Sequence, residues 1–326
     1  MKSGDFDEIR RPGRKPWLVI ILLAIIGVVV FQCYERRGRI TIEAEKQPVP
    51  NKQSQVAVQS VLNKTSAASN SVPKLPPDKS AQVATNADGL SEAKTLDEQG
   101  DLLNARSKYT QLLAENGGAA AQGSEIENAL GRINMELVIT PRPMPEKVEY
   151  VVKKGDRIDR IAKKLGTTKE LIEESNNISN PDLIKAGDYI RVFTGKFSIV
   201  VNKTRNDLLL SMNDAFFKRY SVATGKFGRT PIGTFVVDDK VKEPPWWRPG
   251  EPEIPFGSTN NILGTRWMAL RATGNTPDVK GYGIHGTWDD SSIGKPASAG
   301  CIRMKNAEVE ELFTIIPPGT PVVITE

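Results

Sequence analysis

The C-terminal part of the chain, from Phe197 onward, consists of short alternating segments separated by turns rich in Gly, Pro and Asn. Alternation with a period of two is typical of strands that bury one face, and about eight or more such strands in about 130 residues predict a mainly β domain over 197–326, of β-sandwich or barrel-like form. The clearest segments are 197–202, 208–212 and 234–237. One helix is expected near the end, capped by Asn306 and stopped by Pro317-Pro318-Gly319.

Net charge and the counts of histidine and cysteine exclude several classes of function. The 326 residues carry a net charge of +5, and the part from Lys196 onward holds 16 Lys and Arg against 14 Asp and Glu. Such an even distribution does not predict a nucleic-acid partner. His285 is the single histidine, and Cys33 and Cys301 are the two cysteines. These counts exclude three-histidine zinc sites and a disulfide framework, so we expect neither a metal nor a cofactor.

An apolar run near the N-terminus indicates a membrane anchor. Residues 17–31 (WLVIILLAIIGVVVF) carry no charge, and extension to residue 34 brings the run near the lower limit for a helix that crosses a bilayer. A cleaved signal peptide is the alternative, but no Ala-x-Ala-like site follows, and the large Gln32 before Cys33 does not suit a lipoprotein signal. We therefore expect 1–16 to be a cytoplasmic tail and 17–34 an uncleaved transmembrane helix.

Two segments of contrasting composition follow the apolar run. Residues 35–87 are rich in Gln, Ser, Asn, Ala and Pro and contain no aromatic residue, which predicts a disordered tether. Residues 88–140 return to helical periodicity, with Gly100 between two helices and a capping box, Ser124-x-x-Glu127, that opens a third. The expected buried faces are Leu102, Ala105, Tyr109, Leu112 and Leu113, then Ile126, Ala129, Leu130, Ile133 and Leu137. The segment weakly resembles one tetratricopeptide-like hairpin; because a single repeat cannot bury its own face, a spacer or packing unit is favoured over a peptide-binding groove.

Residues 146–194 predict a compact unit of two strands and two helices in the order βααβ. Residues 148–152 (VEYVV) are typical of a strand, Asp156 is expected to cap a helix that Gly166 ends, and Thr167-x-x-Glu170 is expected to open the second helix. After a turn at Asn180-Pro181, residues 189–192 supply the returning strand.

This unit closely resembles the LysM module over its whole length. The matching runs are Tyr150-Val-Val-Lys-Lys-Gly155-Asp156, Ile161-Ala162-Lys-Lys-Leu165-Gly166, Asn176-Asn-Ile-Ser-Asn180-Pro181 and Ile184-Lys-Ala-Gly187-Asp-Tyr-Ile190. The run Arg157-Ile158-Asp159 departs from the commoner Thr or Ser followed by Leu. The resemblance implies binding of glycans that contain N-acetylglucosamine, and hence contact with peptidoglycan strands. A scaffold module without glycan affinity is the alternative, because core residues carry the fold signature.

The residues that point to catalysis lie near the end of the chain. His285 and Cys301, the cysteine outside the apolar run, are 16 residues apart, in His285-Gly286-Thr287 and Ser298-Ala299-Gly300-Cys301-Ile302-Arg303. A free thiol is only a few per cent thiolate at neutral pH, so a cysteine nucleophile needs a nearby base such as an imidazole. Gly300 permits a turn that exposes the sulfur and backbone N–H groups, and Arg303 lies on the same side of an extended segment. By composition alone, a buried cysteine and an unrelated histidine remain the alternative.

These runs resemble the signature of the L,D-transpeptidase (YkuD-type) family, in which a His-Gly pair precedes Ser-x-Gly-Cys-Ile/Val-Arg. The resemblance covers about residues 197–325. Supporting matches are Ala223-Thr-Gly225-Lys226, Thr230-Pro231-Ile-Gly233-Thr-Phe235, Asn261-Ile-Leu-Gly264, Tyr282-Gly-Ile-His285-Gly286-Thr287 and Gly319-Thr-Pro-Val-Val-Ile324. Ala299 departs from the second histidine that many members have at this position, which leaves the base assignment on His285 intact.

The resemblance implies a cell-wall enzyme of the L,D-transpeptidase fold in which Cys301 is the nucleophile and His285 the general base and acid. His285 is expected to be oriented by the carbonyl of Gly286, and the N–H groups of Gly300 and Cys301 to form the oxyanion hole. The residues expected to bind substrate are Arg303, Tyr282, Ser298 and Thr287. Trp246 and Trp247 either line a substrate cleft or belong to a structural loop.

The implied reaction is acyl transfer from a tetrapeptide stem of peptidoglycan to an amine, with release of D-alanine and formation of a 3-3 crosslink. An L,D-carboxypeptidase or amidase with the same Cys/His site and a non-enzymatic peptidoglycan-binding anchor protein are the alternatives. Because the implied substrates are glycan strands and stem peptides, we expect a single-pass protein of the inner (cytoplasmic) membrane, with residues 35 onward in the periplasm or cell-wall space of a bacterium.

Overall fold

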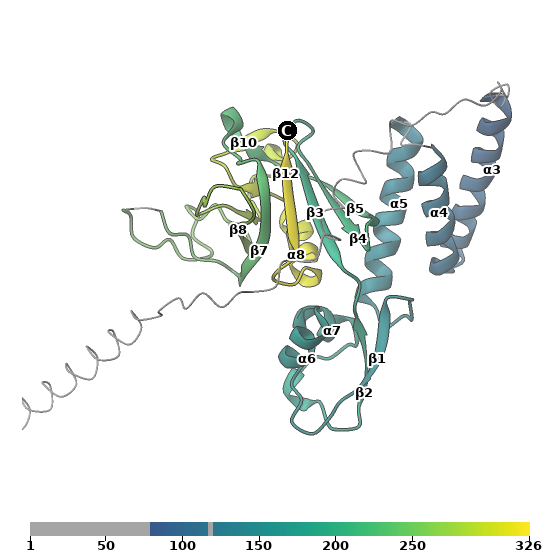
Figure 1. Ribbon diagram of the computed structural model, residues 1–326, viewed down its shortest axis with the longest axis horizontal. Helices are drawn as coiled ribbons and strands as arrows, with labels where there is room; N and C mark the ends of the chain where they lie inside the picture. Colours follow the sequence, from purple (N-terminus) through teal and green to yellow (C-terminus); the bar gives the residue numbers. More distant parts are fainter. Residues whose placement is uncertain (1–78, 117–119, 249) are drawn as a thin grey trace, which may run out of the picture. The chain divides into compact units, whose positions relative to one another are not determined.

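The computed structural model describes residues 79–116, 120–248 and 250–326 (Figure 1). The expected cytoplasmic tail, the transmembrane helix and most of the tether fall within residues 1–78 and so lie outside the described residues. In the part of the chain that is described, no helix combines the length and apolar character needed to cross a bilayer. The N-terminal anchor therefore stays a prediction.

The N-terminal part of the described chain is helical. Its three helices are α3 (Lys79–Glu98), α4 (Leu102–Asn116) and α5 (Ala120–Ile139). Gly100, with a φ of +76°, lies in the turn between α3 and α4, where the sequence places a break. Two details of the prediction are wrong. Residues 79–87 are helical and not part of the tether, because no proline follows Pro77 to stop a helix. The capping box is also wrong, because α5 begins at Ala120 and Ser124 lies inside it.

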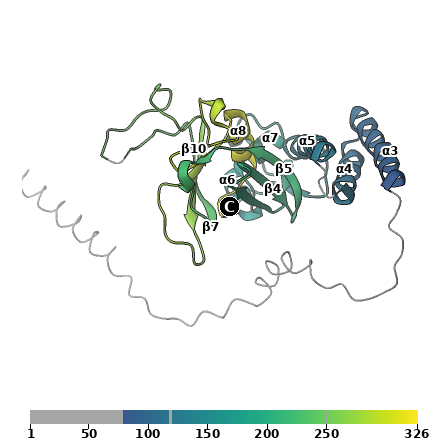
Figure 2. The same ribbon diagram turned by 90° about the horizontal axis from the view of Figure 1, so that it is seen from above.

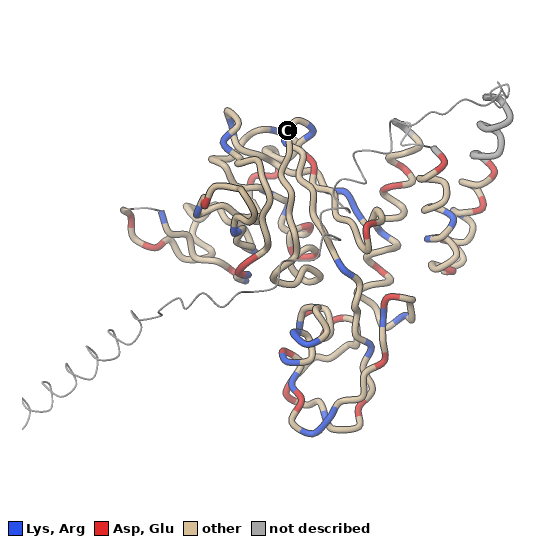
Figure 3. Tube along the Cα trace, in the orientation of Figure 1, with Lys and Arg blue, Asp and Glu red and all other residues tan. Residues whose placement is uncertain are grey.

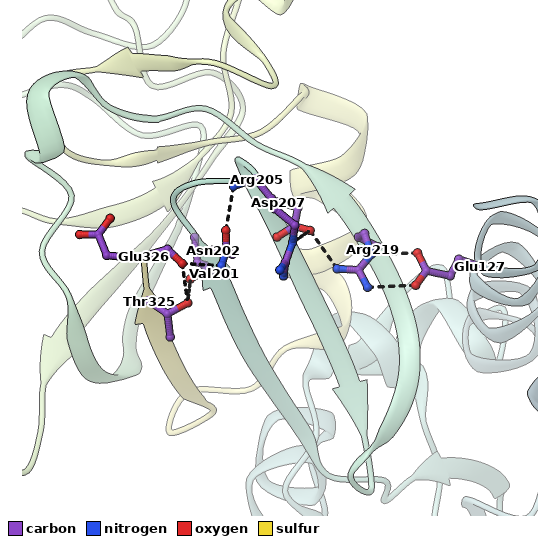
Figure 4. A network of polar contacts seen from close by, with 8 residues as sticks. All are labelled: Glu127, Val201, Asn202, Arg205, Asp207, Arg219, Thr325 and Glu326. Carbon is purple, nitrogen blue, oxygen red and sulfur yellow. Dashed lines mark hydrogen bonds and ion pairs between the residues drawn. The ribbon is translucent and has the colours of Figure 1, made fainter. Parts of the chain in front are cut away.

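The helices share one apolar core with the C-terminal domain. Tyr109 of α4 and Ile126, Leu130 and Ile133 of α5 are at most 2% exposed and belong to the same cluster as the inner residues of the sheet. Polar contacts accompany this packing: Glu127 forms a two-point ion pair with Arg219, which also contacts Asp207 (Figure 4). The apolar faces of these helices are thus used for packing, as the spacer or packing interpretation expects.

Residues 147–193 form the predicted βααβ unit. Its elements are β1 (Lys147–Val151), α6 (Ile158–Leu165), α7 (Lys169–Ser175), η1 (Pro181–Leu183) and β2 (Tyr189–Phe193). The two strands are antiparallel, with Lys147 opposite Phe193. A small separate core lies between the helices and the strands: Val152, Ile158, Ile161, Ala162, Ile172, Ile190 and Val192. Gly166 ends α6 in the left-handed conformation, with φ +71°, as expected from its position.

The predicted helix caps of this unit are wrong by one residue each. Arg157, not Asp156, precedes α6, and the Asp156 carboxylate instead accepts hydrogen bonds from Lys153 N–H and the Tyr150 hydroxyl. Thr168, not Thr167, caps α7, and its Oγ1 accepts from Leu171 N–H at 3.0 Å. Thr167 cannot take that place because its own N–H still bonds to Ala162 O at the end of α6.

The C-terminal domain is mainly β, as predicted, but it contains one large curled sheet and not a two-sheet sandwich (Figure 2). The order of its eight strands is β11-β9-β8-β7-β12-β3-β4-β5, and β10 and β6 form a separate parallel pair. The strands are β3 (Phe197–Asn202), β4 (Asp207–Met212), β5 (Ala215–Ser221), β6 (Thr224–Gly225), β7 (Gly233–Lys242), β8 (Arg266–Ala272), β9 (Gly283–His285), β10 (Pro296–Ser298), β11 (Ile302–Arg303) and β12 (Pro321–Thr325). Short 3-10 turns occur at Lys226–Gly228 and Asp290–Ser292.

The expected C-terminal helix is present as α8 (Asn306–Ile315), which packs on β8 and β9. Asn306 is its first residue and not its cap, because the Asn306 side chain is used elsewhere: its Oδ1 accepts from Thr265 N–H at 3.1 Å. At the other end of α8, Lys240 Nζ donates to the carbonyls of Phe313 and Ile316. Basic and acidic residues are interspersed along the described chain (Figure 3), in keeping with the even charge distribution of the sequence.

Candidate active site

Two neighbouring parallel strands bring the predicted catalytic residues to one face of the sheet. In the β9–β11 pair, Arg303 lies opposite His285, and Cys301 directly precedes β11. Partners in a parallel pair point to the same face, so Arg303 and His285 share a face. Cys301 lies just before the strand, and the charge of Arg303 acts on both the His285 ring and the Cys301 thiol. Residues that are 16 positions apart in sequence are thereby placed within reach of the same substrate.

His285 is held in one orientation and one tautomer by its surroundings. The ring is 2% exposed, and Nδ1 lies 2.6 Å from Gly286 O. A carbonyl oxygen only accepts, so Nδ1 carries the proton and the lone pair of Nε2 is available to accept another. A side chain at position 286 would overlap Asn306 Oδ1 and lie 3.1 Å from Thr265 N, which explains why a glycine occupies this position.

Trp267 forms one wall of the histidine site, and the sequence alone did not indicate it. Trp267 lies opposite His285 in the β8–β9 pair, and the two rings stack with centroids 5.7 Å apart and planes 26° apart. A Cβ at Gly283 would lie 2.7 Å from this indole ring, so Gly283 leaves room for the tryptophan. An aromatic residue in a strand is a general core signal, and only the strand register identifies it as a neighbour of the histidine.

The protonation states of His285 and Cys301 follow from burial. Burial lowers the pKa of His285 to about 4, against the opposing effect of the Gly286 and Leu263 carbonyls, and the charge of Arg303 lowers it further. Burial raises the pKa of the Cys301 thiol, while Gly283 N–H and Arg303 act in the opposite direction. At neutral pH the site therefore holds a neutral imidazole and a neutral thiol, which favours proton transfer during attack over a preformed ion pair.

The turn of residues 298–301, which carries Cys301, is fixed by hydrogen bonds. Ser298 Oγ donates to Cys301 O at 2.6 Å and accepts from Gly300 N–H at 3.0 Å. Gly300 has a φ of +148°, and a Cβ there would lie 2.6 Å from the ring of Tyr282. Ser298 and Tyr282 thus shape the turn from two sides. The thiol is half-buried, with Cys301 Sγ 3.6 Å from Gly281 O.

The two N–H groups that are expected to form the oxyanion hole, those of Gly300 and Cys301, differ in their hydrogen bonds. Gly300 N–H is already engaged by Ser298 Oγ. Cys301 N–H, in contrast, has no hydrogen-bond acceptor among the described residues. Cys301 N–H is therefore the donor of this pair that is available to a substrate oxyanion in the geometry of the structure.

The remaining predicted residues differ in their burial and in their hydrogen bonds. Arg303 is half-buried, and its Nε is a buried donor without a hydrogen-bond partner in the described chain. Thr287 is 4% exposed, and its Oγ1 accepts from Asp289 N–H at 3.1 Å, which indicates a turn-forming role. Trp246 pairs with Ile254 within the loop between β7 and β8, whereas Trp247 is 63% exposed.

Comparison with known proteins identifies both domains. The family model described as the L,D-transpeptidase catalytic domain matches residues 196–324, and the LysM domain model matches residues 150–193. YqjB of Bacillus subtilis, which bears the name of an L,D-transpeptidase, is 46% identical over 129 residues, covering 39% of this chain and 70% of that protein. YkuD of Bacillus licheniformis, named in the same way, is 36% identical over 183 residues, covering 54% of this chain and 98% of that protein.

Among solved structures, an L,D-transpeptidase from Mycobacterium smegmatis matches with a TM-score of 0.33 and 18% identity, covering 43% of this chain and 64% of that one. The assignment to a family rests on the family model and on the sequence identity to the curated relatives. The chain belongs to the L,D-transpeptidase family, and it is an acyltransferase of the L,D-transpeptidase type with a LysM domain before its catalytic domain. The family predicted from the motifs is confirmed.

Proposed function

We propose that the protein crosslinks peptidoglycan by cysteine acyl transfer from a tetrapeptide stem to an amine acceptor, forming 3-3 crosslinks. The observation that carries this proposal is the pairing of Arg303 with His285, next to Cys301, with the imidazole held by Gly286 O so that Nε2 can accept a proton. An acyl-transfer enzyme needs a nucleophile, a base and a group that binds the substrate charge, and these three side chains are of the required types.

In the first half of the proposed reaction, Cys301 Sγ attacks the carbonyl on the L-centre of diaminopimelate while His285 Nε2 takes the thiol proton. A carbon–sulfur bond forms, and the carbonyl electron pair moves onto oxygen, where Cys301 N–H stabilises it. Collapse of this intermediate breaks the bond to D-alanine, whose nitrogen receives the proton from His285. The product is a thioester on Cys301 and free D-alanine.

In the second half, an amine of another stem attacks the thioester and gives its proton to His285. The carbon–sulfur bond breaks, and the proton returns to the departing thiolate, which restores the resting site. A low pKa suits His285 to this cycle because the ring is neutral, and hence able to accept a proton, at neutral pH. The unpartnered Nε of Arg303 supports the proposal that this guanidinium binds a carboxylate of the stem.

The LysM domain supports a second part of the proposal, namely that glycan strands are held near the active site. Few residues separate β2 of this domain from β3 of the catalytic domain, so a bound strand raises the local concentration of stems. We also propose that residues 17–34 anchor the protein in the inner membrane as a single span, with residues 35 onward on the cell-wall side. The uncharged run at 17–31 supports a single span, and the need of both domains for peptidoglycan supports the orientation.

The test is incubation of the purified full-length protein with muropeptides that carry tetrapeptide stems, followed by mass spectrometry. The expected result is release of D-alanine together with 3-3 crosslinked dimers, and loss of both with Cys301→Ala. Release of D-alanine without dimers would show that water is the acceptor and that the protein is a carboxypeptidase. Absence of both products with the unaltered protein would contradict the proposal.

A further inference from the structure

A buried hydroxyl lies directly behind the nucleophile turn. Thr230 is 1% exposed and belongs to the loop between β6 and β7. Its Oγ1 accepts a hydrogen bond from Gly225 N–H at 2.7 Å and lies 2.8 Å from Gly300 O. Because an amide N–H only donates and a carbonyl oxygen only accepts, the hydroxyl proton of Thr230 must point at Gly300 O.

The carbonyl that Thr230 contacts belongs to the same peptide group as the N–H of the nucleophile. Gly300 C=O and Cys301 N–H lie in one plane and, in a trans peptide, point in opposite directions. A hydrogen bond that fixes the carbonyl therefore fixes the direction of Cys301 N–H. Such a bond also draws electron density toward the carbonyl oxygen, which makes the N–H a stronger donor.

The other backbone groups of Gly300 and Cys301 are held from the opposite side. Ser298 Oγ accepts from Gly300 N–H and donates to Cys301 O. Of the four backbone polar groups of these two residues, Cys301 N–H is the one without an acceptor in the described chain. The turn is thus organised so that this single donor faces away from Thr230.

The backbone behind the turn is closely packed around the hydroxyl. A Cβ at Gly225 would lie 2.6 Å from Thr230 N and 3.0 Å from Gly300 Cα, so three backbone segments are in close contact there. Without the hydroxyl, Gly225 N–H and Gly300 O would both be left buried and unpaired. The Gly300–Cys301 peptide would then be free to rotate toward another hydrogen-bond arrangement.

We propose that Thr230 is a positioning residue for acyl transfer, whose hydroxyl orients and polarises the Gly300–Cys301 peptide so that Cys301 N–H stabilises the oxyanion. This inference rests on the cysteine acyl-transfer chemistry of the proposed function but not on the identity of the peptidoglycan substrate. The step that it affects is the formation of the carbon–sulfur bond, in which the carbonyl pair moves onto oxygen and the thiol proton moves to His285. Thr230 touches neither the substrate nor the reacting atoms.

The test compares two reactions of the same sulfur in full-length protein that carries Cys33→Ser. Acylation of Cys301 by 4-nitrophenyl acetate passes through an oxyanion, whereas alkylation by iodoacetamide does not. Thr230→Val removes the hydroxyl and keeps the shape of the side chain. It is expected to slow acylation about 10- to 100-fold, which is less than the loss of a whole oxyanion donor. The rate of alkylation is expected to stay within about twofold of that of the unaltered protein. Thr230→Ser keeps the hydroxyl and is expected to restore acylation to within about threefold of the unaltered protein.

The matched control is Thr224→Val. Thr224 is also 1% exposed, but its hydroxyl donates to Asn206 Oδ1 at 2.7 Å and does not contact the turn. This variant is expected to lose thermal stability to a similar extent and to keep the acylation rate. If Thr230→Val does not fold, Thr230→Ala serves in its place under the same comparison.

Equal loss of acylation and alkylation would overturn the proposal, because it would show that Thr230 only presents the thiol. Unchanged acylation in Thr230→Val, or a serine variant as slow as the valine variant, would overturn it as well. If the unaltered protein forms no product from muropeptides but Thr230→Val still slows ester acylation, the proposed function is contradicted. The inference about Thr230 then still stands.

Discussion

The turn of residues 298–301 and the contact between α5 and β5 are held together by different forces. Around Cys301, the hydroxyl groups of Ser298 and Thr230 bond to backbone groups. Between α5 and β5, the apolar side chains of Ile133 and Phe217 are fully buried. The Asn134 side chain adds one hydrogen bond to Phe217 O there.

This difference separates the determinants of activity from those of stability. A hydrogen bond to a backbone group sets the direction of a donor or a sulfur atom with a precision that apolar contacts do not provide. Burial of apolar side chains is non-directional, but it supplies most of the free energy of folding. Substitutions in the turn should therefore change rates more than melting temperatures, and substitutions at the contact should do the reverse.

The largest effect is expected for Cys301→Ala. Loss of the sulfur removes the nucleophile, so acyl transfer should fall to background, while the melting temperature should stay close to that of the unaltered protein because no large cavity forms. Muropeptide mass spectrometry and thermal denaturation check both parts. A folded alanine variant that still forms crosslinks would contradict the assignment of the nucleophile.

The second effect concerns stability alone. Ile133→Ala should lower the free energy of unfolding by about 2–5 kcal/mol, because a fully buried side chain is removed from the core shared by α5 and the sheet. Acyl transfer measured well below the new melting temperature should be unchanged. Leu103→Ala, at a position 38% exposed on α4, is the control and should change stability by no more than about 0.5 kcal/mol. A fall in the catalytic rate of folded Ile133→Ala would show that the two regions are coupled.

The third effect is the pH dependence of the rate. His285 must be neutral to accept the thiol proton, and burial lowers its pKa to about 4, so the acid limb of kcat/KM should lie near pH 4 and the rate should be flat from pH 5 to 7. A histidine with the ordinary value of 6.5 would instead lose about 30-fold by pH 5. Stopped-time assays across this range, with thermal denaturation at each pH, distinguish the two. A limb near 6.5 would show that the ring is solvated during turnover.

The smallest effect is expected for Glu127→Gln. This change breaks the two-point ion pair with Arg219, whose side chain is partly exposed, so stability should fall by only about 1 kcal/mol. The rate of acyl transfer should not change. Glu136→Gln is the control, because its contact with Arg132 is 3.7 Å long and more exposed, and it should have no measurable effect. A loss of several kcal/mol for Glu127→Gln would show that the ion pair behaves as a buried one.

The regular elements and the motif residues were predictable from the sequence, whereas the residues that cap the helices were not. The faces of α4 and α5, the βααβ unit and the strands after Phe197 follow from spacing within one segment. The caps at Asp156, Thr167 and Asn306 were wrong because a cap depends on which residue begins the helix, and on competing hydrogen bonds such as the one from Thr265 N–H to Asn306. The sequence left a sandwich and a barrel-like form open, because strand spacing does not say whether strands join one sheet or two, and the single curled sheet agrees with the barrel-like form.

The sequence by itself determined which chemistry is possible, since one histidine and one cysteine in a family signature leave few choices for base and nucleophile. The tertiary structure alone decided how that chemistry is controlled. It stacks Trp267 on His285, buries the ring so that its pKa falls to about 4, and brings Thr230 to Gly300 across 70 positions of sequence. These features depend on sheet register and on distance from solvent. Both are set by contacts between segments far apart in the chain, so they cannot be predicted from residue spacing within a single segment.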